Sequence, residues 1–338
     1  MNSSQIREEI QSYLEKGEIE KALNALITAL NKSSLRREHD NALLLKAQWE
    51  GIKQEQLRGI LSRQEYEVAV NKIVVGVQTV TNDVHNNKTA LEFNQKIEDP
   101  FYNQMVKVKG GVFQMGSNLW GSGKMYQDEK PIHDVNISTF KISKYLVTRK
   151  QWKYIMNFDI PASEEVMECD QCPIKGVSWY DTQNFISRLN QKTGQAYRLP
   201  SESEWEFAAR GGKLSRGYDY PGSNDADKVA WHNISNGGRY QAAYPVGEKL
   251  PNELGLYDMS GNAEEWVEDD WHDNYNGAPN DGKPWLDINQ KDVHKVLRGG
   301  YWCGNPDYCR SADRGHADPN ISDYYKNKRF GFRLAHNK

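Results

Sequence analysis

All twelve prolines of this 338-residue chain lie beyond position 99, as do nine of its ten tryptophans. Before that point, from about residue 3 to residue 85, Leu and Ile recur at three- and four-residue spacing, which indicates amphipathic helices. Proline is disfavoured inside helices because it lacks an N–H group and clashes with the preceding turn. The chain therefore divides into a helical part and a part of another class, and its length suits two domains.

The first part predicts a small all-α four-helix bundle over residues 1–85. We expect helices joined by short turns near residues 4–16, 18–32, 35–58 and 62–84. Gly17 occupies the position of a C-terminal cap, and Ser62 with Glu65 has the spacing of a capping box. Residues 86–99 are polar and lack periodicity, so we interpret them as a linker.

The second part, residues 100–338, combines short strands with long loops. Residues 105–117 and 133–148 alternate in the manner of strands, and Thr148 can cap a following helix. Two further helices are expected, one over 177–194 that Gly194 closes, and one over 198–212 that begins with a Ser201/Glu204 capping box. Strands around two helices make an α+β arrangement.

Charge and cysteine usage exclude several classes of protein. The formal net charge is -3, so no overall field attracts nucleic acid or an anionic membrane. No apolar run approaches the ~18 residues of a membrane span, and the N-terminus lacks a secretory apolar core, so we expect a soluble cytoplasmic protein.

Four cysteines do not make a disulfide scaffold, and reduced thiols are expected. Cys169 and Cys172 form a lone CxxC, which favours an incidental loop pair over zinc.

Six blocks of the second part carry a family resemblance. They are GGVFQMGS (110–117), EKPIHDVNISTFKISKYLVT (129–148), PIKGVSWYDTQNFISRLN (173–190), RLPSESEWEFAARGG (198–212), PNELGLYDMSGNAEEWVEDDW (251–271) and VLRGGYWC…RFGFRLA (296–335). In this order they resemble the formylglycine-generating-enzyme, or sulfatase-modifying factor, family, which implies a C-type-lectin-like fold. Scaffold roles are expected for Trp205, Trp266, Trp302, Phe332, Gly299, Gly300 and Gly331.

The resemblance also bears on catalysis. In the enzymes of that family two cysteines with four residues between them bind copper and convert a substrate cysteine to formylglycine, and a soft thiolate pair suits Cu(I). Here Cys303 and Cys309 have five residues between them. A displacement by one residue turns a strand side chain to the other face. We therefore expect no copper and no catalytic residue, while Cys303 and Cys309 would act if the chain were a copper thiol oxidase.

A structural calcium site is implied by the segment DMSGNAEEW (258–266), which resembles the family's calcium loop. Oxygen ligands suit this hard cation. Carried over, the ligands are Asp258, Gly261, Ala263 and Glu265, although the enzymes typically have Asn at the first position. The family's other calcium loop has no counterpart in residues 231–247.

The histidines show no HxxxH-type spacing, which disfavours an iron-dependent relative of this fold; they are His133, His232, His272, His294 and His316.

Between VLRGG and RFGFRLA lies a segment rich in Tyr, Ser, Gly, Asn, Asp and His. Tyr supplies large contact area at small entropic cost, and the polar residues supply adaptable contacts. The predicted ligand-binding residues are Tyr301, Cys303, Gly304, Asn305, Asp307, Tyr308, Ser311, Asp313, Gly315, His316, Asp318, Asn320, Ser322, Asp323, Tyr324 and Tyr325. Each can be reached from the codon AAC by changing adenines. The segment thus resembles the variable proteins of diversity-generating retroelements, although an ordinary family member can have a naturally Asn-rich loop here.

Residues 14–26 and 57–83 resemble the effector-associated domains of bacterial conflict systems. In that group such bundles are homotypic adaptors that link a sensor to an effector. The alternative interpretation of residues 1–85 is a bundle with a purely structural or oligomerising role. The sequence as a whole predicts a non-catalytic protein whose C-terminal face binds a protein or peptide ligand and whose bundle engages an effector with a matching bundle. No nucleic-acid or membrane partner is expected, and the alternatives are the copper thiol oxidase and a purely structural oligomer.

Overall fold

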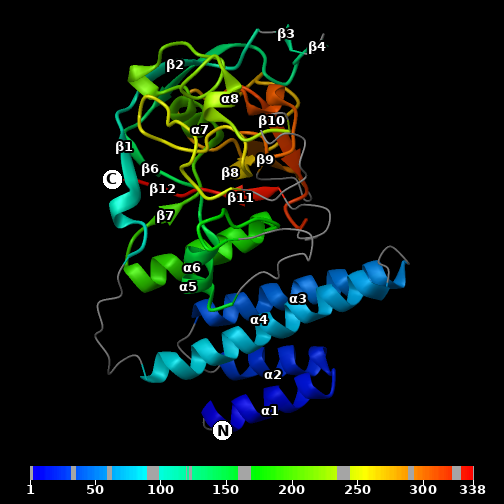
Figure 1. The fold of residues 1–338 in the computed structure, drawn as a ribbon. Helices are drawn as coiled ribbons and strands as arrows, with labels where there is room; N and C mark the ends of the chain where they lie inside the picture. Colours follow the sequence, from blue (N-terminus) through cyan, green and yellow to red (C-terminus); the bar gives the residue numbers. More distant parts are fainter. Residues whose placement is uncertain are drawn as a thin grey trace. The chain divides into compact units, whose positions relative to one another are not determined.

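A computed structural model describes most of the chain, namely residues 3–31, 36–58, 63–89, 99–118, 120–121, 124–158, 169–233, 244–287, 293–321 and 329–337. The chain divides into two compact units, Met1–Lys96 and Ile97–Lys338. The first unit is helical and the second mixes helices with strands (Figure 1), which confirms the predicted fold class. In the described residues no helix is both long and apolar enough to cross a membrane.

The first unit contains four helices, as predicted: α1 (Ser3–Glu15), α2 (Ile19–Asn31), α3 (Arg36–Leu57) and α4 (Arg63–Thr89). They bury a shared core that includes Leu23, Leu26 and Val77. Gly17 ends α1 in the left-handed region and donates its N–H to Leu14 O at 3.0 Å. The Ser62/Glu65 capping box lies outside the described residues. α4 continues to Thr89, so it enters the segment that the sequence assigned to a linker.

The second unit contains two four-stranded sheets. The first has the order β1 (Met105–Val108), β6 (Phe140–Ser143), β12 (Ala335–His336), β7 (Tyr197–Arg198), and the second has the order β10 (Arg314–Ala317), β9 (Lys295–Arg298), β8 (Glu264–Asp270), β11 (Phe330–Phe332). Two further strand pairs are β2 (Gly111–Met115) with β5 (His133–Ile137) and β3 (Trp120–Gly121) with β4 (Lys124–Met125). Only β8 and β11 pair in parallel among these described strands.

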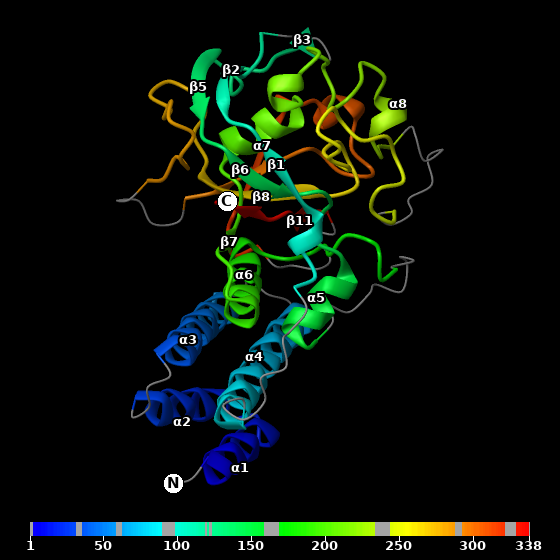
Figure 2. The ribbon, with the colours of Figure 1, turned by 90° about the vertical axis from the view of Figure 1, so that its left-hand side faces the viewer.

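Four helices and three short 3₁₀ turns complete the second unit. They are α5 (Arg149–Met156), α6 (Trp179–Thr193), α7 (Glu202–Ala209), α8 (Ala226–Val229), η1 (Tyr102–Gln104), η2 (Gly212–Leu214) and η3 (Pro306–Cys309). α6 contacts α5 and β7, whereas α7 contacts β2, β5, β8 and β9 (Figure 2). Thr148 caps α5, Ser201 with Glu204 forms the capping box of α7, and Gly194 ends α6 in the left-handed region, so these three predictions are confirmed.

Aromatic side chains fill the interior of the second unit. One cluster contains Trp152, Trp266 and Phe332, and the other contains Trp205 and Phe207. Trp205, Trp266 and Phe332 are completely buried and Trp302 is 7% exposed. The scaffold roles predicted for these aromatic residues are confirmed. Burying each such side chain stabilises the fold by about 1.5–3 kcal/mol.

The cysteines differ from the sequence expectation in one respect. Cys169 and Cys172 form a disulfide with a Cα–Cα distance of 5.0 Å, whereas we expected reduced thiols throughout. A backbone hydrogen bond from Cys172 N to Cys169 O at 3.0 Å folds the intervening turn and brings the two side chains together. Cys303 and Cys309 are free.

Candidate ligand-recognition face

The C-terminal segment leaves β9 through two glycines that adopt the left-handed region, Gly299 at φ 91° and Gly300 at φ 68°. Glycine is suited to this conformation because it has no Cβ. At Gly300 the reason is also steric, since a Cβ there would lie 2.5 Å from Tyr308 O. The backbone of the segment therefore folds back closely on itself, and the scaffold role predicted for these two glycines is confirmed.

Local hydrogen bonds fix the turn between Tyr301 and Cys309. The Asn305 side chain accepts from Asp307 N at 2.9 Å, and Tyr308 N donates to Asn305 O at 2.9 Å. Ser260 Oγ donates to Cys309 O at 2.9 Å, which ties the end of this turn to the 258–263 loop. The turn is therefore built largely by backbone groups and one asparagine.

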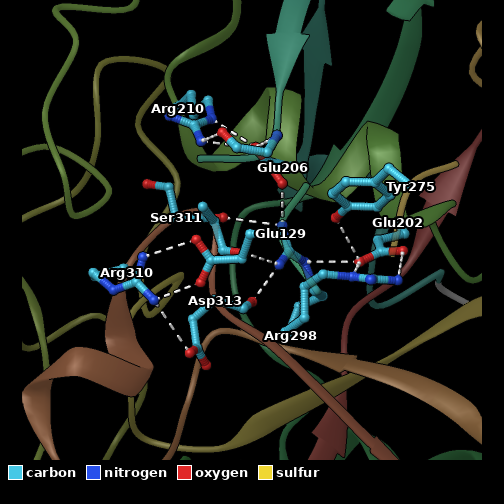
Figure 3. A network of polar contacts seen from close by, with 12 residues as sticks. Glu129, Glu202, Glu206, Arg210, Tyr275, Arg298, Arg310, Ser311 and Asp313 are labelled. Atoms are coloured by element: carbon cyan, nitrogen blue, oxygen red, sulfur yellow. Dashed lines mark hydrogen bonds and ion pairs between the residues drawn. The ribbon is translucent and has the colours of Figure 1, made fainter. Parts of the chain in front are cut away.

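Arg298, the last residue of β9, anchors the part of the segment that follows. Its guanidinium is completely buried and donates to three successive carbonyls, those of Ser311, Ala312 and Asp313. It also forms an ion pair with Glu206 of α7 (Figure 3). Burial by itself would raise the pKa of Glu206, but Arg210 and Arg298 hold that pKa below its ordinary value. Glu206 thus remains charged and positions the anchor.

Two more arginines of the segment pair with carboxylates from distant parts of the chain. Arg310 donates to Glu129 at 2.5 and 3.1 Å (Figure 3). Arg314 donates to Glu202 at 2.6 and 3.1 Å. Tyr275 donates its hydroxyl to Glu202 at 3.1 Å. A charge-assisted hydrogen bond is roughly twice as strong as a neutral one. The segment is thus held by buried side chains that do not belong to the predicted contact set.

The predicted ligand-binding residues divide into four groups. Five are exposed: Asn305, Tyr308, His316, Asp318 and Asn320. Four are half-buried: Tyr301, Cys303, Asp307 and Gly315. Three are buried: Gly304, Ser311 and Asp313. Four lie outside the described residues: Ser322, Asp323, Tyr324 and Tyr325.

Three predicted contact residues are buried and need a correction: Gly304, Ser311 and Asp313. For Ser311 and Asp313 the structure shows the cause. Both were predicted as contact residues, but they are only 1% and 8% exposed. The reason is that their carbonyls bind the buried Arg298, which draws this stretch into the domain. The nine residues of the face that remain accessible surround the turn at 301–308 and continue along β10.

The thiols of the segment are in environments that favour their neutral form. Burial raises the pKa of Cys309, and the carboxyl groups of Asp313 and Glu264 raise it further. Burial also raises the pKa of the half-buried Cys303, although Arg329 and Lys175 oppose that shift. The thiolate is the form that attacks substrates and binds soft metals. In the metal-free chain neither cysteine is therefore activated as a nucleophile.

Two of the predicted calcium ligands already have hydrogen-bond partners within the protein. Both carboxylate oxygens of Glu265 already bind Arg333, at 2.7 and 2.8 Å, and one also accepts from Trp205 Nε1 at 2.9 Å. The Asp258 carboxylate accepts from Gly247 N at 2.7 Å. A guanidinium thus occupies the position of a cation beside Glu265, so this donor set does not fit calcium in this conformation. Calcium at Asp258, Gly261, Ala263 and Glu265 stays a prediction, which a calcium titration followed by thermal unfolding would check.

Sequence reasoning missed Glu264, which lies beneath the recognition face. It is 8% exposed, its Oε2 has no hydrogen-bond partner, and Arg329 Nε is 3.4 Å away. Burial raises the pKa of Glu264 to about 7, against the opposing effect of Arg329. Gly315 makes room for this side chain, because a Cβ there would collide with Glu264 Oε1. The only signal of Glu264 in the sequence is its position next to Glu265, within a block of mostly buried residues.

Replacing Glu264 by glutamine should stabilise the protein above neutral pH. Because the folded pKa is raised, the native state binds the extra proton, and wild-type stability falls as the pH rises from about 4.5 to about 7. Glutamine does not ionise, so Glu264→Gln should gain about 1–3 kcal/mol relative to wild type over this range and keep that gain at higher pH. Urea unfolding at several pH values measures it. A variant that is less stable at every pH would contradict this reading of the site.

A two-sheet α+β domain whose C-terminal segment is displayed on an anchored backbone defines a C-type-lectin-like recognition scaffold. Residues 92–338 match the sulfatase-modifying factor enzyme 1-like domain, and the chain belongs to that family. Residues 5–85 match effector-associated domain 11. The two family resemblances drawn from the sequence are thereby confirmed.

Solved structures and curated relatives agree with this assignment. PvdO from Pseudomonas aeruginosa is 33% identical, with a TM-score of 0.58 over 69% of this chain and 94% of that chain. Treponema denticola variable protein 1 is 25% identical, with a TM-score of 0.56 over 69% of this chain and 95% of that chain. The chaperone protein LppX of Paenibacillus barcinonensis is 28% identical over 64% of this chain and 84% of its own length. The chain spans only 38% of the Chlamydia trachomatis kinase Pkn1, to which it is 30% identical.

Proposed function

We propose that this chain is a non-catalytic ligand-recognition protein of a bacterial conflict system. Its C-terminal face binds a protein ligand, and its four-helix bundle couples that event to an effector that carries a matching bundle. The observation that carries the proposal is the anchoring of the segment by Arg298 through three main-chain carbonyls. In the neighbouring turn Asn305 has a structural role as the cap of η3, whereas the exposed Tyr308 side chain is available for contact.

Main-chain anchoring has a direct consequence for sequence tolerance. A carbonyl accepts the same hydrogen bond whatever side chain its residue carries, so the backbone path of residues 311–313 does not depend on the side chains of those residues. Asn305 and Tyr308 are exposed while the ion pairs of Arg310 and Arg314 are buried. The likeness to a Treponema denticola variable protein supports a face whose side chains can be rewritten by a diversity-generating retroelement.

The exposed chemistry favours a protein ligand. Tyr308 is 44% exposed, and Tyr301 is half-buried under Arg329, whose guanidinium lies 4.6 Å from the centre of the Tyr301 ring. Rigid aromatic rings surrounded by Asn and Asp provide the contact area and adaptable polar groups typical of protein-binding faces. The match of residues 5–85 to an effector-associated domain supports the coupling role of the bundle.

A capture experiment with matched variants tests the recognition role. The full chain, immobilised and exposed to lysate of the source cells and their phages, should retain a ligand that the double variant Tyr308→Ala, Asn320→Ala loses, because both residues are exposed on the predicted face. Tyr154→Ala is the control, because Tyr154 lies on α5 and is 45% exposed, close to the 44% of Tyr308. If every captured protein is retained equally by all three chains, or if none is captured, recognition by this face is wrong.

Effector binding through the bundle can be measured separately from ligand binding at the C-terminal face. An effector bound through the bundle should be retained by the double variant, since both substitutions lie in the other unit. Sequencing of the neighbouring genes provides an independent check. A reverse transcriptase with an adenine-mismatched repeat of the 301–328 segment, together with a gene encoding a similar bundle, is the expected finding; a locus with neither would argue against both halves of the proposal.

Thiol labelling distinguishes this proposal from a copper thiol oxidase. In the native protein iodoacetamide should modify Cys303 slowly and Cys309 only after unfolding, because Cys309 is completely buried and burial raises its pKa. Copper titration in the presence of a cysteine-containing peptide should give no oxygen consumption. Uptake of one copper ion that both Cys303→Ser and Cys309→Ser abolish would instead establish the oxidase.

A further inference from the structure

Two histidines at the edge of the second sheet face one another. In the register of β9 and β10, His316 lies opposite Val296, and His294 is two residues before Val296 along the chain. Residues two apart share one face of a strand, so the two imidazoles are diagonal neighbours within reach of each other. Their Nδ1 atoms are 2.7 Å apart, and the ring centres are 4.9 Å apart with an interplanar angle of 32°.

This approach brings two ligand atoms to one point. A neutral imidazole carries one N–H group and one lone pair, so two facing nitrogens need a shared proton or a cation between them. Imidazole nitrogen binds Zn²⁺ at about 2.0–2.1 Å, so a tetrahedral ion places two such nitrogens about 3.3 Å apart. The two rings must therefore turn and separate by about 0.6 Å from the observed 2.7 Å. Both side chains are exposed, which permits that small movement.

The surroundings of His316 favour its neutral ring. Partial burial lowers the pKa of His316. The neighbouring His294 and Arg314 lower that pKa further, whereas Asp273 and Asp128 oppose the shift. Arg314 is itself paired with Glu202, so its charge is largely compensated. Trp271 packs on His316 with a centre-to-centre distance of 4.3 Å and donates Nε1 to Asp273 at 3.0 Å, which holds the carboxylate beside the pair.

We propose that His294 and His316 form a surface site for a divalent transition-metal ion of the zinc class. Within the described part of the chain no three His, Cys, Asp or Glu side chains are grouped for metal binding. The protein therefore supplies two nitrogen ligands, water fills the remaining positions, and the affinity is lower than that of a closed structural zinc site. The ion links β9 to β10 and stiffens the end of the recognition face independently of any bound ligand.

Zinc titration of the full chain tests the site. Isothermal titration of EDTA-treated protein with Zn²⁺ at pH 7.5 should show one ion per chain in wild type, and at least tenfold weaker binding in His294→Asn and in His316→Asn. Zinc should also raise the Tm of wild type and not that of the two variants, because an ion that binds only the native state stabilises it. The Tm without zinc shows whether each variant is folded.

Two controls exclude other ligands. His39→Asn removes a histidine of the first unit and should bind zinc as wild type does. Cys303→Ser removes the half-buried thiol and should also bind as wild type does. Equal affinity in all variants, no binding to wild type, or a loss confined to Cys303→Ser would overturn the proposal.

Discussion

Replacing Arg298 by alanine is expected to lower the free energy of unfolding of the second unit by about 3–5 kcal/mol. The guanidinium is completely buried, so its removal leaves the Glu206 carboxylate with Arg210 and the Gly116 N–H group, and deprives the carbonyls of Ser311, Ala312 and Asp313 of this donor. A loss of this size lowers the Tm by about 6–20 °C in a domain of this length. Thermal unfolding followed by tryptophan fluorescence measures it.

An exposed ion pair of the same unit provides the control. Lys153 lies 3.1 Å from Asp170, with side chains that are 40% and 62% exposed. Such surface pairs contribute about 0–1 kcal/mol, so Lys153→Ala should leave the Tm nearly unchanged. If Arg298→Ala unfolded at the same temperature as this control, the anchoring role of Arg298 would be wrong.

Replacing Gly300 by alanine is expected to displace the recognition turn and abolish ligand binding. The left-handed conformation at φ 68° disfavours a side chain by about 1–3 kcal/mol, and the new Cβ would stand 2.5 Å from Tyr308 O. The backbone at Tyr308 must therefore move, which should also open Cys309 to iodoacetamide in the folded protein. Labelling rate, urea unfolding and ligand capture together measure these effects.

Gly277 is the matched control for Gly300. It has φ 87°, but a Cβ there would meet nothing within 4 Å. Gly277→Ala should therefore show the conformational penalty alone, with wild-type labelling of Cys309 and unchanged ligand capture. The same labelling rate in both variants would show that close contact between Gly300 and the turn does not protect Cys309.

The features that sequence predicted well are those with local causes. The Ser201/Glu204 box, the Thr148 cap and the Gly194 stop each depend on residues within four positions, and the structure has all three. The four helices of the bundle follow in the same way from the spacing of apolar residues. The lectin-like topology itself came from family resemblance, because short strands in long loops give little periodic signal.

The features that sequence missed depend on partners far apart in the chain. Glu129 and Arg310 are separated by 181 residues and Glu202 and Arg314 by 112, so no local pattern indicates either pair. Ser311 and Asp313 were misjudged for the same reason, since their composition suits a contact face while the distant Glu206 and Arg298 fix their burial. A search for histidines at helical spacing likewise overlooks two that only strand register brings together.

The last described residues join parts of the second unit that form separately along the chain. β11 adds to β8 at the edge of one sheet, and β12 lies between β6 and β7 in the other (Figure 1). During synthesis neither sheet can close until residues 330–336 have emerged from the ribosome, whereas every helix of the bundle is available after residue 89. The bundle can therefore fold early, and a ribosome stalled before Phe330 would carry a folded helical bundle together with a second unit whose sheets are incomplete.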